Sequence, residues 1–253
     1  MPEINGIVLD AVTREPIKEG WVMASIGINV RTVAGDVGQV VEVAPAHLRT
    51  DGAGRFRIPS KVIEIPPFPV TFGREVENLI ITVWTLDQRG VIKLGVDRLK
   101  GRRVEVVIYA EDVEELMNRK LADLPVEKRE MERLRSEFSS LQSLYEYCET
   151  GRFGIEVPAV DGGCDEWELN YAIKRHERFL AKYKGPKTRD QKLYYSAIKS
   201  QLGYLLRKKG DYLSALRIFQ ELKEFDEERK VKLWLRDYER QIKELKELLG
   251  EQK

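Results

Sequence analysis

Residues 4–17 read INGIVLDAVTREPI and residues 50–59 read TDGAGRFRIP. The first stretch has the composition of a strand that runs into a turn. In the second stretch, Asp51 can accept backbone N–H groups in an Asx-turn, and Gly54 can adopt the positive φ that sends the chain back. The strand that leaves this turn carries Phe56 and Ile58 on one side, and we expect both side chains to face a core.

The pattern Thr-Asp-x-x-Gly-x-Phe, formed here by Thr50, Asp51, Gly54 and Phe56, resembles the carboxypeptidase regulatory-like domain. That resemblance implies an antiparallel β-sandwich of the prealbumin (transthyretin-like) type. Such domains are usually accessory modules, so the resemblance also implies that Asp51 has a structural role and not a catalytic one.

The composition excludes several classes of protein. The 253 residues include 43 basic and 42 acidic side chains, so the net charge of +1 gives no overall field that favours nucleic acid or an anionic membrane. No run of about 18 apolar residues predicts a membrane span. Charged residues make up 34% of the chain, and five Asn and eight Gln are few, which favours a thermophilic source.

Two cysteines, Cys148 and Cys164, are too few for a disulfide-stapled secreted fold. The N-terminal residues have neither the basic nor the apolar segment of a signal peptide. We therefore expect a cytoplasmic protein. A secreted protein is the alternative, because the resemblance implies a type of module that is common outside cells.

The composition changes near residue 111, from β-branched residues punctuated by Gly and Pro to long runs of Glu, Lys, Arg and Leu. The change predicts an α+β protein of two segregated domains, a β-sandwich over 1–111 and an all-α domain over 112–253. We expect strands near 3–11, 20–32, 39–49, 54–58, 78–86, 90–96 and 102–110. We expect helices near 112–121, 126–149, 165–184, 188–209, 212–224 and 226–249.

Three segments of the β half have more specific expectations. Residues 77–85, rich in β-branched side chains, are expected to form a central strand. Residues 102–109 alternate cleanly and are expected to close the sheet. The proline-rich residues 63–69 are expected to form an extended crossover, because proline removes the donors that a central strand needs.

Residues 196–222 resemble a tetratricopeptide repeat. The resemblance depends on Leu202, Gly203, Leu206, a turn at 210–212, and a second helix with Ala215, Phe219 and Leu222 on one face. It implies close helix contacts at Gly203 and Ala215. Two positions depart from the family pattern, Lys199 where a large apolar residue is preferred and Glu227 where Pro is common. Because one repeat cannot bury its own face, we expect the flanking helices to complete a short array; a generic helical bundle is the alternative.

The sequence offers little for catalysis or metal binding. Cys148, Cys164 and His176 are the soft ligands of the α half, but structural zinc usually takes four ligands with a close Cys pair. His47 and His176 lack the His-x-x-Glu spacing of carboxypeptidase ligands, and the glycines at 151–154 and 162–163 match no phosphate loop. A Cys148–His176 nucleophile pair has only its residue types in its favour. We therefore predict no enzyme activity, no metal and no cofactor.

A binding surface is the remaining functional feature. In tetratricopeptide arrays the first helices line the concave groove, and the resemblance carries this role to Ala197, Ser200, Tyr204, Arg207 and Lys208. Tyr204 with Arg207 and Lys208 suits an acidic segment or a C-terminal carboxylate. The alternative is a solvated basic helix end that complements the helix dipole.

The sequence thus predicts a non-enzymatic interaction protein whose helical half binds a protein or peptide partner, and no nucleic acid. The first alternative is an accessory module for a carbohydrate or a cell envelope, with exposed aromatic residues on the β half. Its candidates are Trp21, Trp84, Phe68 and Phe72. The second alternative is an enzyme with a site in the loop 151–164.

Overall fold

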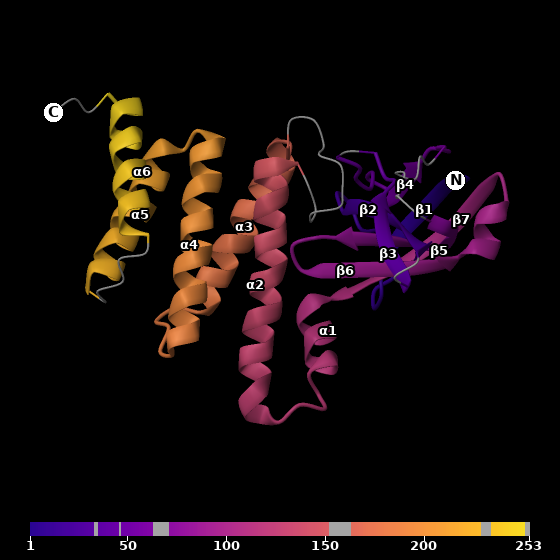
Figure 1. The fold of residues 1–253 in the computed structure, drawn as a ribbon, viewed down its shortest axis with the longest axis horizontal. Coiled ribbons are helices and arrows are strands. Elements are labelled where there is room, and N and C mark those ends of the chain that lie inside the picture. The colour runs from indigo at the N-terminus through magenta and orange to yellow at the C-terminus, as the bar shows by residue number, and fades with distance from the viewer. Residues whose placement is uncertain (33–34, 46, 63–70, 152–162, 229–233, 251–253) are drawn as a thin grey trace. The chain divides into compact units, whose positions relative to one another are not determined.

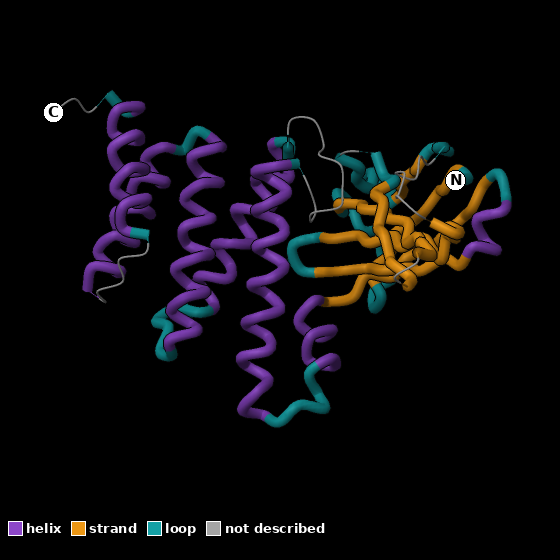
Figure 2. Tube along the Cα trace, in the orientation of Figure 1, coloured by secondary structure: helices purple, strands orange, loops and turns teal. Residues whose placement is uncertain are grey.

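The computed structural model describes residues 1–32, 35–45, 47–62, 71–151, 163–228 and 234–250 (Figure 1). The described chain forms two compact units that divide between Leu124 and Pro125. Figure 2 shows the strands in the first unit and most of the helices in the second. Helix α1 (Val113–Lys120) belongs to the first unit, so the units divide after the predicted boundary at 111/112. That the two halves fold independently stays a prediction.

The first unit contains a seven-stranded mixed sheet with the order β3-β2-β5-β6-β7-β1-β4. Each strand overlaps a predicted range. The largest shifts are at the start of β5, which begins at Thr71 and not near residue 78, and at the end of β3, which ends at Glu42 and not near residue 49. The strands are β1 (Glu3–Asp10), β2 (Trp21–Thr32), β3 (Gly35–Glu42), β4 (Arg55–Ile58), β5 (Thr71–Trp84), β6 (Gln88–Gly95) and β7 (Arg103–Asp112).

The expectation of a purely antiparallel sheet is wrong for one pair of strands. β1 runs parallel to β7, from Glu3 beside Arg103 to Asp10 beside Ala110. β7 therefore lies inside the sheet and does not close it; β3 and β4 are the edge strands. The sequence could not show this, because alternating burial indicates which face of a strand is covered but not the direction of its neighbour. The expectation for residues 77–85 is confirmed, since β5 lies between β2 and β6.

One face of β1, β2, β4, β5, β6 and β7 contributes to a single hydrophobic core, and the side chains of β3 lie outside what the structure describes. The alternation in β7 buries Val104, Val106 and Ile108 while their neighbours in sequence are exposed. β6 pairs with β7 only over Gln88–Gly90 and Ala110–Asp112. The group of strands that ends at β6 therefore shares few ladder hydrogen bonds with the group that begins at β7. The predicted crossover at 63–69 lies outside the described residues.

The turn before β4 has the predicted mechanism. The Asp51 carboxylate accepts the backbone N–H groups of Ala53 at 2.9 Å and Arg55 at 2.8 Å. These bonds, that from Arg55 first, lower the pKa of Asp51. Gly54 has φ +71°, and Phe56 is buried. The structural role predicted for Asp51 follows from these contacts.

In the described residues the second unit has five helices, and the first three agree with their predicted ranges to within two residues. The prediction for the last two is less accurate, because α5 continues to Glu228 and α6 begins at Leu235 and not near residue 226. Thr188 begins α4 with a capping box, and Gly151 and Gly210 end α2 and α4 in the left-handed conformation. The Asp112 carboxylate caps α1 by accepting the backbone N–H groups of Glu114 and Glu115. The helices are α2 (Val126–Thr150), α3 (Glu166–Lys182), α4 (Arg189–Lys209), α5 (Tyr212–Glu228) and α6 (Leu235–Leu248).

Each helix of this unit packs against the next in sequence, and α2 also packs against α4. Gly203 lies where α4 approaches α5, since a Cβ there would be 2.8 Å from the Phe219 ring. Ala215 is fully buried. Lys199, one of the two departures from the repeat pattern, forms an ion pair with Glu221 of α5 at 2.6 Å while most of its side chain is covered. The aliphatic stem of a lysine can thus cover surface that an apolar residue covers elsewhere.

In the part of the chain that the structure describes, no helix combines the length and the apolar character needed to cross a membrane.

Candidate functional site

The first-helix face, which we define as Ala197, Ser200, Tyr204, Arg207 and Lys208 of α4, lines two hollows in the second unit. Helices α2, α4 and α6 follow one another across this unit (Figure 1). They contribute most of the walls, together with Tyr212 of α5 and Trp234 just before α6. The aromatic hollow has a volume of about 270 Å³. It is lined by Tyr145, Ala197, Ser200, Gln201, Tyr204, Trp234, Asp237 and Tyr238.

The second hollow, here called the mixed hollow, has a volume of about 500 Å³. Tyr204 lines both hollows, so they adjoin at its side chain. All five residues of the first-helix face therefore lie on one continuous lined surface. The mixed hollow is lined by Glu149, Tyr204, Arg207, Lys208, Tyr212 and Leu248.

The polar groups of this surface already have partners in the protein. The Tyr204 hydroxyl donates to Asp237 of α6. Arg207 donates to Gln241 and pairs with Glu244 at 2.7 Å. These bonds hold α4 and α6 together, so the basic character that the sequence assigned to the surface is partly neutralised from α6.

Lys208 donates its ammonium to the backbone carbonyl of Cys148, near the C-terminal end of α2. This bond satisfies a helix-end carbonyl with a cation, which the helix dipole favours. It also fixes the lysine at the edge of the mixed hollow, between α2 and α4.

Burial and nearby carboxylates raise the pKa values of two tyrosines that line the aromatic hollow. Burial raises the pKa of Tyr145, and Glu149, Asp237 and Glu146 raise it further, in that order. Burial also raises the pKa of Tyr204, with Asp237 the next cause. Both phenols are therefore neutral at ordinary pH and act as apolar walls with a hydrogen-bonding end.

Sequence reasoning missed the side of the site that α2 and α6 supply. Tyr145, Trp234 and Asp237 could not be found from the repeat pattern, because it covers only the α4–α5 pair. A weaker signal existed in the amphipathic stripe of the last helix, in which Trp234 and Tyr238 are four residues apart.

The two cysteines lie together where α2 ends and α3 begins. Both are buried, and the Cys164 thiol is 3.9 Å from the carbonyl oxygen of Cys148. The hydrogen bond between the thiols, together with burial, raises the pKa of Cys148 far above its ordinary value. A thiol with so little thiolate is a poor nucleophile.

His176 does not form the nucleophile pair that the sequence left open. It is fully buried, with Nδ1 2.7 Å from the Ala172 carbonyl and Nε2 3.2 Å from the Gln201 amide. Burial lowers the pKa of His176 to about 4, so the ring is neutral at pH 7. Both ring contacts are to acceptor oxygens, so the neutral ring donates to only one of them, and Gln201 donates its own amide to Gln142 of α2. The described contacts therefore make His176 a link between helices.

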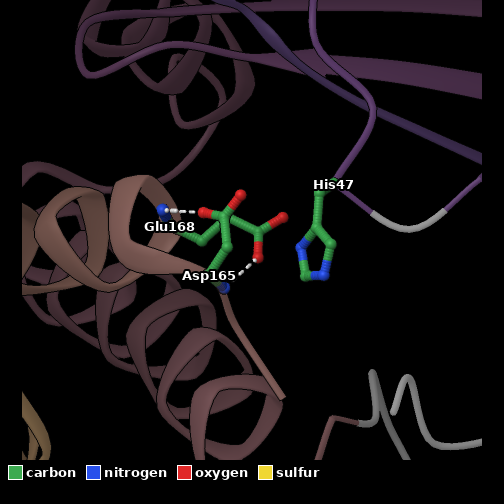
Figure 3. Close-up of side chains that lie close together, drawn as sticks. All are labelled: His47, Asp165 and Glu168. Carbon is green, nitrogen blue, oxygen red and sulfur yellow. Dashed lines mark hydrogen bonds between the residues drawn. The ribbon is translucent and has the colours of Figure 1, made fainter. Parts of the chain in front are cut away.

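A capping box begins α3. The backbone N–H of Asp165 donates to the Glu168 carboxylate at 2.9 Å, and the backbone N–H of Glu168 donates to the Asp165 carboxylate at 2.9 Å (Figure 3). The fully buried Glu168 also accepts from the hydroxyl of Tyr147 at 3.2 Å. These contacts serve to anchor α3 on α2. His47, drawn in the same figure, belongs to the first unit.

The candidates for the alternative functions are less well placed. Trp21 is only 4% exposed, so the expectation that it is an exposed glycan platform is wrong. Trp84 is half-buried and has the Arg89 guanidinium 4.3 Å from its ring centre. Phe68, the side chain of Phe72 and the loop at 152–162 lie outside what the structure describes.

Comparison of the chain with models of known protein families, with curated proteins and with solved structures finds no significant match.

Proposed function

We propose that this chain is a non-enzymatic interaction protein whose helical unit binds a segment of a protein partner on the first-helix face. The observation that carries the proposal is that two adjoining hollows meet at Tyr204, with walls from α2, α4, α5 and α6. An extended or helical segment that crosses Tyr204 can place one side chain in each hollow. Aromatic residues and arginine, which dominate binding energy at protein interfaces, line this surface.

We propose further that the two units have the folds implied by the resemblances. A sandwich is supported by the short β6–β7 pairing and by the one core between the strands on either side of it. A tetratricopeptide-like array is supported by the close approach of Gly203 to Phe219 and by the order in which the helices pack. Under this proposal α2, α4 and α6 are first helices, and α3 and α5 are second helices.

An acidic segment remains the candidate partner at the mixed hollow. A carboxylate of the partner would replace Glu244 as the ion-pair partner of Arg207, whose side chain is 31% exposed. Exchange of one carboxylate for another leaves the guanidinium paired throughout, so binding does not require a buried, unpaired charge. This exchange of carboxylates alone adds little affinity. Most of the binding free energy must come from side chains of the partner that fill the hollows.

The test is selection of a random peptide library on the full-length protein, followed by affinity measurements on two matched variants. Ser200→Phe fills the aromatic hollow, and Gln220→Phe places the same ring on the exposed side of α5. We expect the selected peptides to bind Ser200→Phe at least tenfold more weakly and Gln220→Phe unchanged. Equal binding to both variants, with melting temperatures that show both are folded, would remove the first-helix face as the binding site.

A further inference from the structure

The aromatic hollow has an unusual set of walls. Four of its eight lining residues are aromatic, and α2, α4 and α6 each supply at least one of them. The ring centres of Tyr145 and Tyr204 are 6.3 Å apart at an interplanar angle of 44°, so neither ring stacks flat on the other. Both rings are half-buried, as is Trp234, whereas Tyr238 is almost fully buried. The hollow therefore presents partly accessible π-systems to whatever enters it.

Negative charge accompanies these rings. Asp237 is the one ionisable acid or base, apart from the tyrosines, among the residues that line the hollow. Glu149 and Glu146 of α2 also act on Tyr145 and raise its pKa. Arg240 is the cation on α6 that pairs with Asp237, and its side chain is 64% exposed, so it lies at the solvent side of that carboxylate. Arg207 lines the mixed hollow and is paired with Glu244.

We propose that the aromatic hollow receives the charged end of a lysine or arginine side chain of the partner segment. This inference rests on the proposed function and names the chemistry recognised at one of its two hollows. A cation within about 6 Å of the centre of a Trp or Tyr ring is attracted by the ring quadrupole. Asp237 supplies a carboxylate that can accept from the ammonium or guanidinium in exchange for Arg240.

The size of the hollow agrees with one side chain. Pockets that enclose small molecules usually measure about 300–1,000 Å³, and this hollow measures about 270 Å³. An aliphatic side chain would also fit by size, but it offers no donor to the Asp237 carboxylate, which already accepts from Tyr204 and Arg240. A basic side chain buries its stem against the rings and keeps its charge beside the carboxylate.

A basic residue here is compatible with an acidic residue at the mixed hollow. Arg207 and Lys208 line only the mixed hollow, and Asp237 lines only the aromatic hollow. The surface is thus bipolar, and Tyr204 lies at the boundary between its two halves. The partner segment is expected to carry charges of both signs in a fixed order.

The experiment uses the full-length protein and three small probes. Nα-acetyl-lysine methylamide carries the ammonium, Nα-acetyl-norleucine methylamide is its neutral counterpart, and choline represents a free quaternary ammonium ion. NMR titration should show at least tenfold tighter binding of the lysine probe than of the norleucine probe, and choline should bind no tighter than the lysine probe. Equal binding of the two amides, or no binding of the lysine probe at 100 mM, would overturn the inference. A tenfold preference for choline over the lysine amide would overturn the assignment to a partner side chain.

Two variants connect the preference to the hollow. Asp237→Asn keeps the shape of the side chain and removes its charge, so the preference for lysine over norleucine should fall at least threefold. Glu239→Gln makes the same change of charge two residues away on the same helix, where Glu239 pairs with Lys223, and should leave the preference unchanged. Tyr145→Leu, on α2, is the second test of the hollow if Asp237→Asn does not fold, and it should weaken lysine binding at least threefold. An unchanged preference in the folded variant would overturn the inference.

The outcomes separate this inference from the proposed function. Selected peptides that bind the first-helix face without enrichment in Lys or Arg would support the groove and contradict the cation site. Binding of the lysine probe in a protein that selects no peptide would support the cation site and contradict the binding of a protein segment.

Discussion

Acidification should weaken the helical unit through His176. The neutral imidazole has one N–H, and the 2.7 Å contact from Nδ1 to the Ala172 carbonyl places it on Nδ1. A second proton on Nε2 would create a cation that is fully buried, with Arg175 opposing it further. The contacts from Ala172 and Gln201 favour the cation, but the burial outweighs them and lowers the pKa of His176 from 6.5 to about 4.

The sign and the size of the effect follow from this lowered pKa. In the unfolded chain His176 takes up a proton near pH 6.5, whereas in the folded protein it does so only near pH 4. The stabilisation is therefore fully present above pH 6.5 and is lost as the pH falls toward 4. One pKa unit corresponds to about 1.4 kcal/mol, so the loss is about 2 kcal/mol at pH 5 and about 3 kcal/mol at pH 4 and below.

Urea unfolding, followed by circular dichroism at 222 nm, measures the effect at pH 7.5 and pH 5.0. Other groups titrate in the same range, so the informative quantity is the difference in unfolding free energy between the native protein and His176→Gln. This difference should fall by about 2 kcal/mol on acidification because only the native protein carries the buried histidine. His47→Gln, the matched change at the other histidine of the chain, should retain the full pH dependence assigned to His176.

NMR provides a direct check on the same reasoning. The chain has two histidines, so the ring proton signals can be assigned with His47→Gln. The His176 signal should not titrate between pH 7.5 and pH 5.0. A His176 pKa of 6 or higher, or a free-energy difference that is independent of pH, would refute the argument from burial.

The other predictions concern packing, folding and reactivity. Gly203→Leu and Ala215→Leu should each cost about 1–3 kcal/mol by overpacking the contact between α4 and α5, and an unchanged melting temperature would show that the helices do not meet at that residue. Fragments 1–124 and 125–253 should each give a cooperative melt, and a fragment that melts without cooperativity would contradict its independence as a domain. Cys148 should resist iodoacetamide at pH 8 in the native protein and react after denaturation, because its raised pKa leaves little thiolate; rapid native alkylation would contradict this.

The sequence predicted those features that depend on neighbours in the chain. Asp51 and Gly54 form their turn through bonds that span only a few residues, so their chemistry could be read directly. The glycine at 210, in the predicted turn at 210–212, marks the end of α4 for the same reason. The start of β5 at Thr71 could not be read in this way, because the ladder with β2 extends that strand through contacts far away in sequence.

The same distinction between local and long-range contacts applies to the candidate site. The sequence by itself determined that Ser200, Tyr204 and Arg207 share one face of a helix, since the period of 3.6 residues fixes the faces of any helix. Only the tertiary structure decided what that face meets: Asp237 opposes Tyr204, and Glu244 pairs with Arg207. The direction of β1 beside β7 was decided in the same way. Local periodicity and turn chemistry act within a few residues, whereas the charge of a hollow and the pairing of strands depend on segments that only packing brings together.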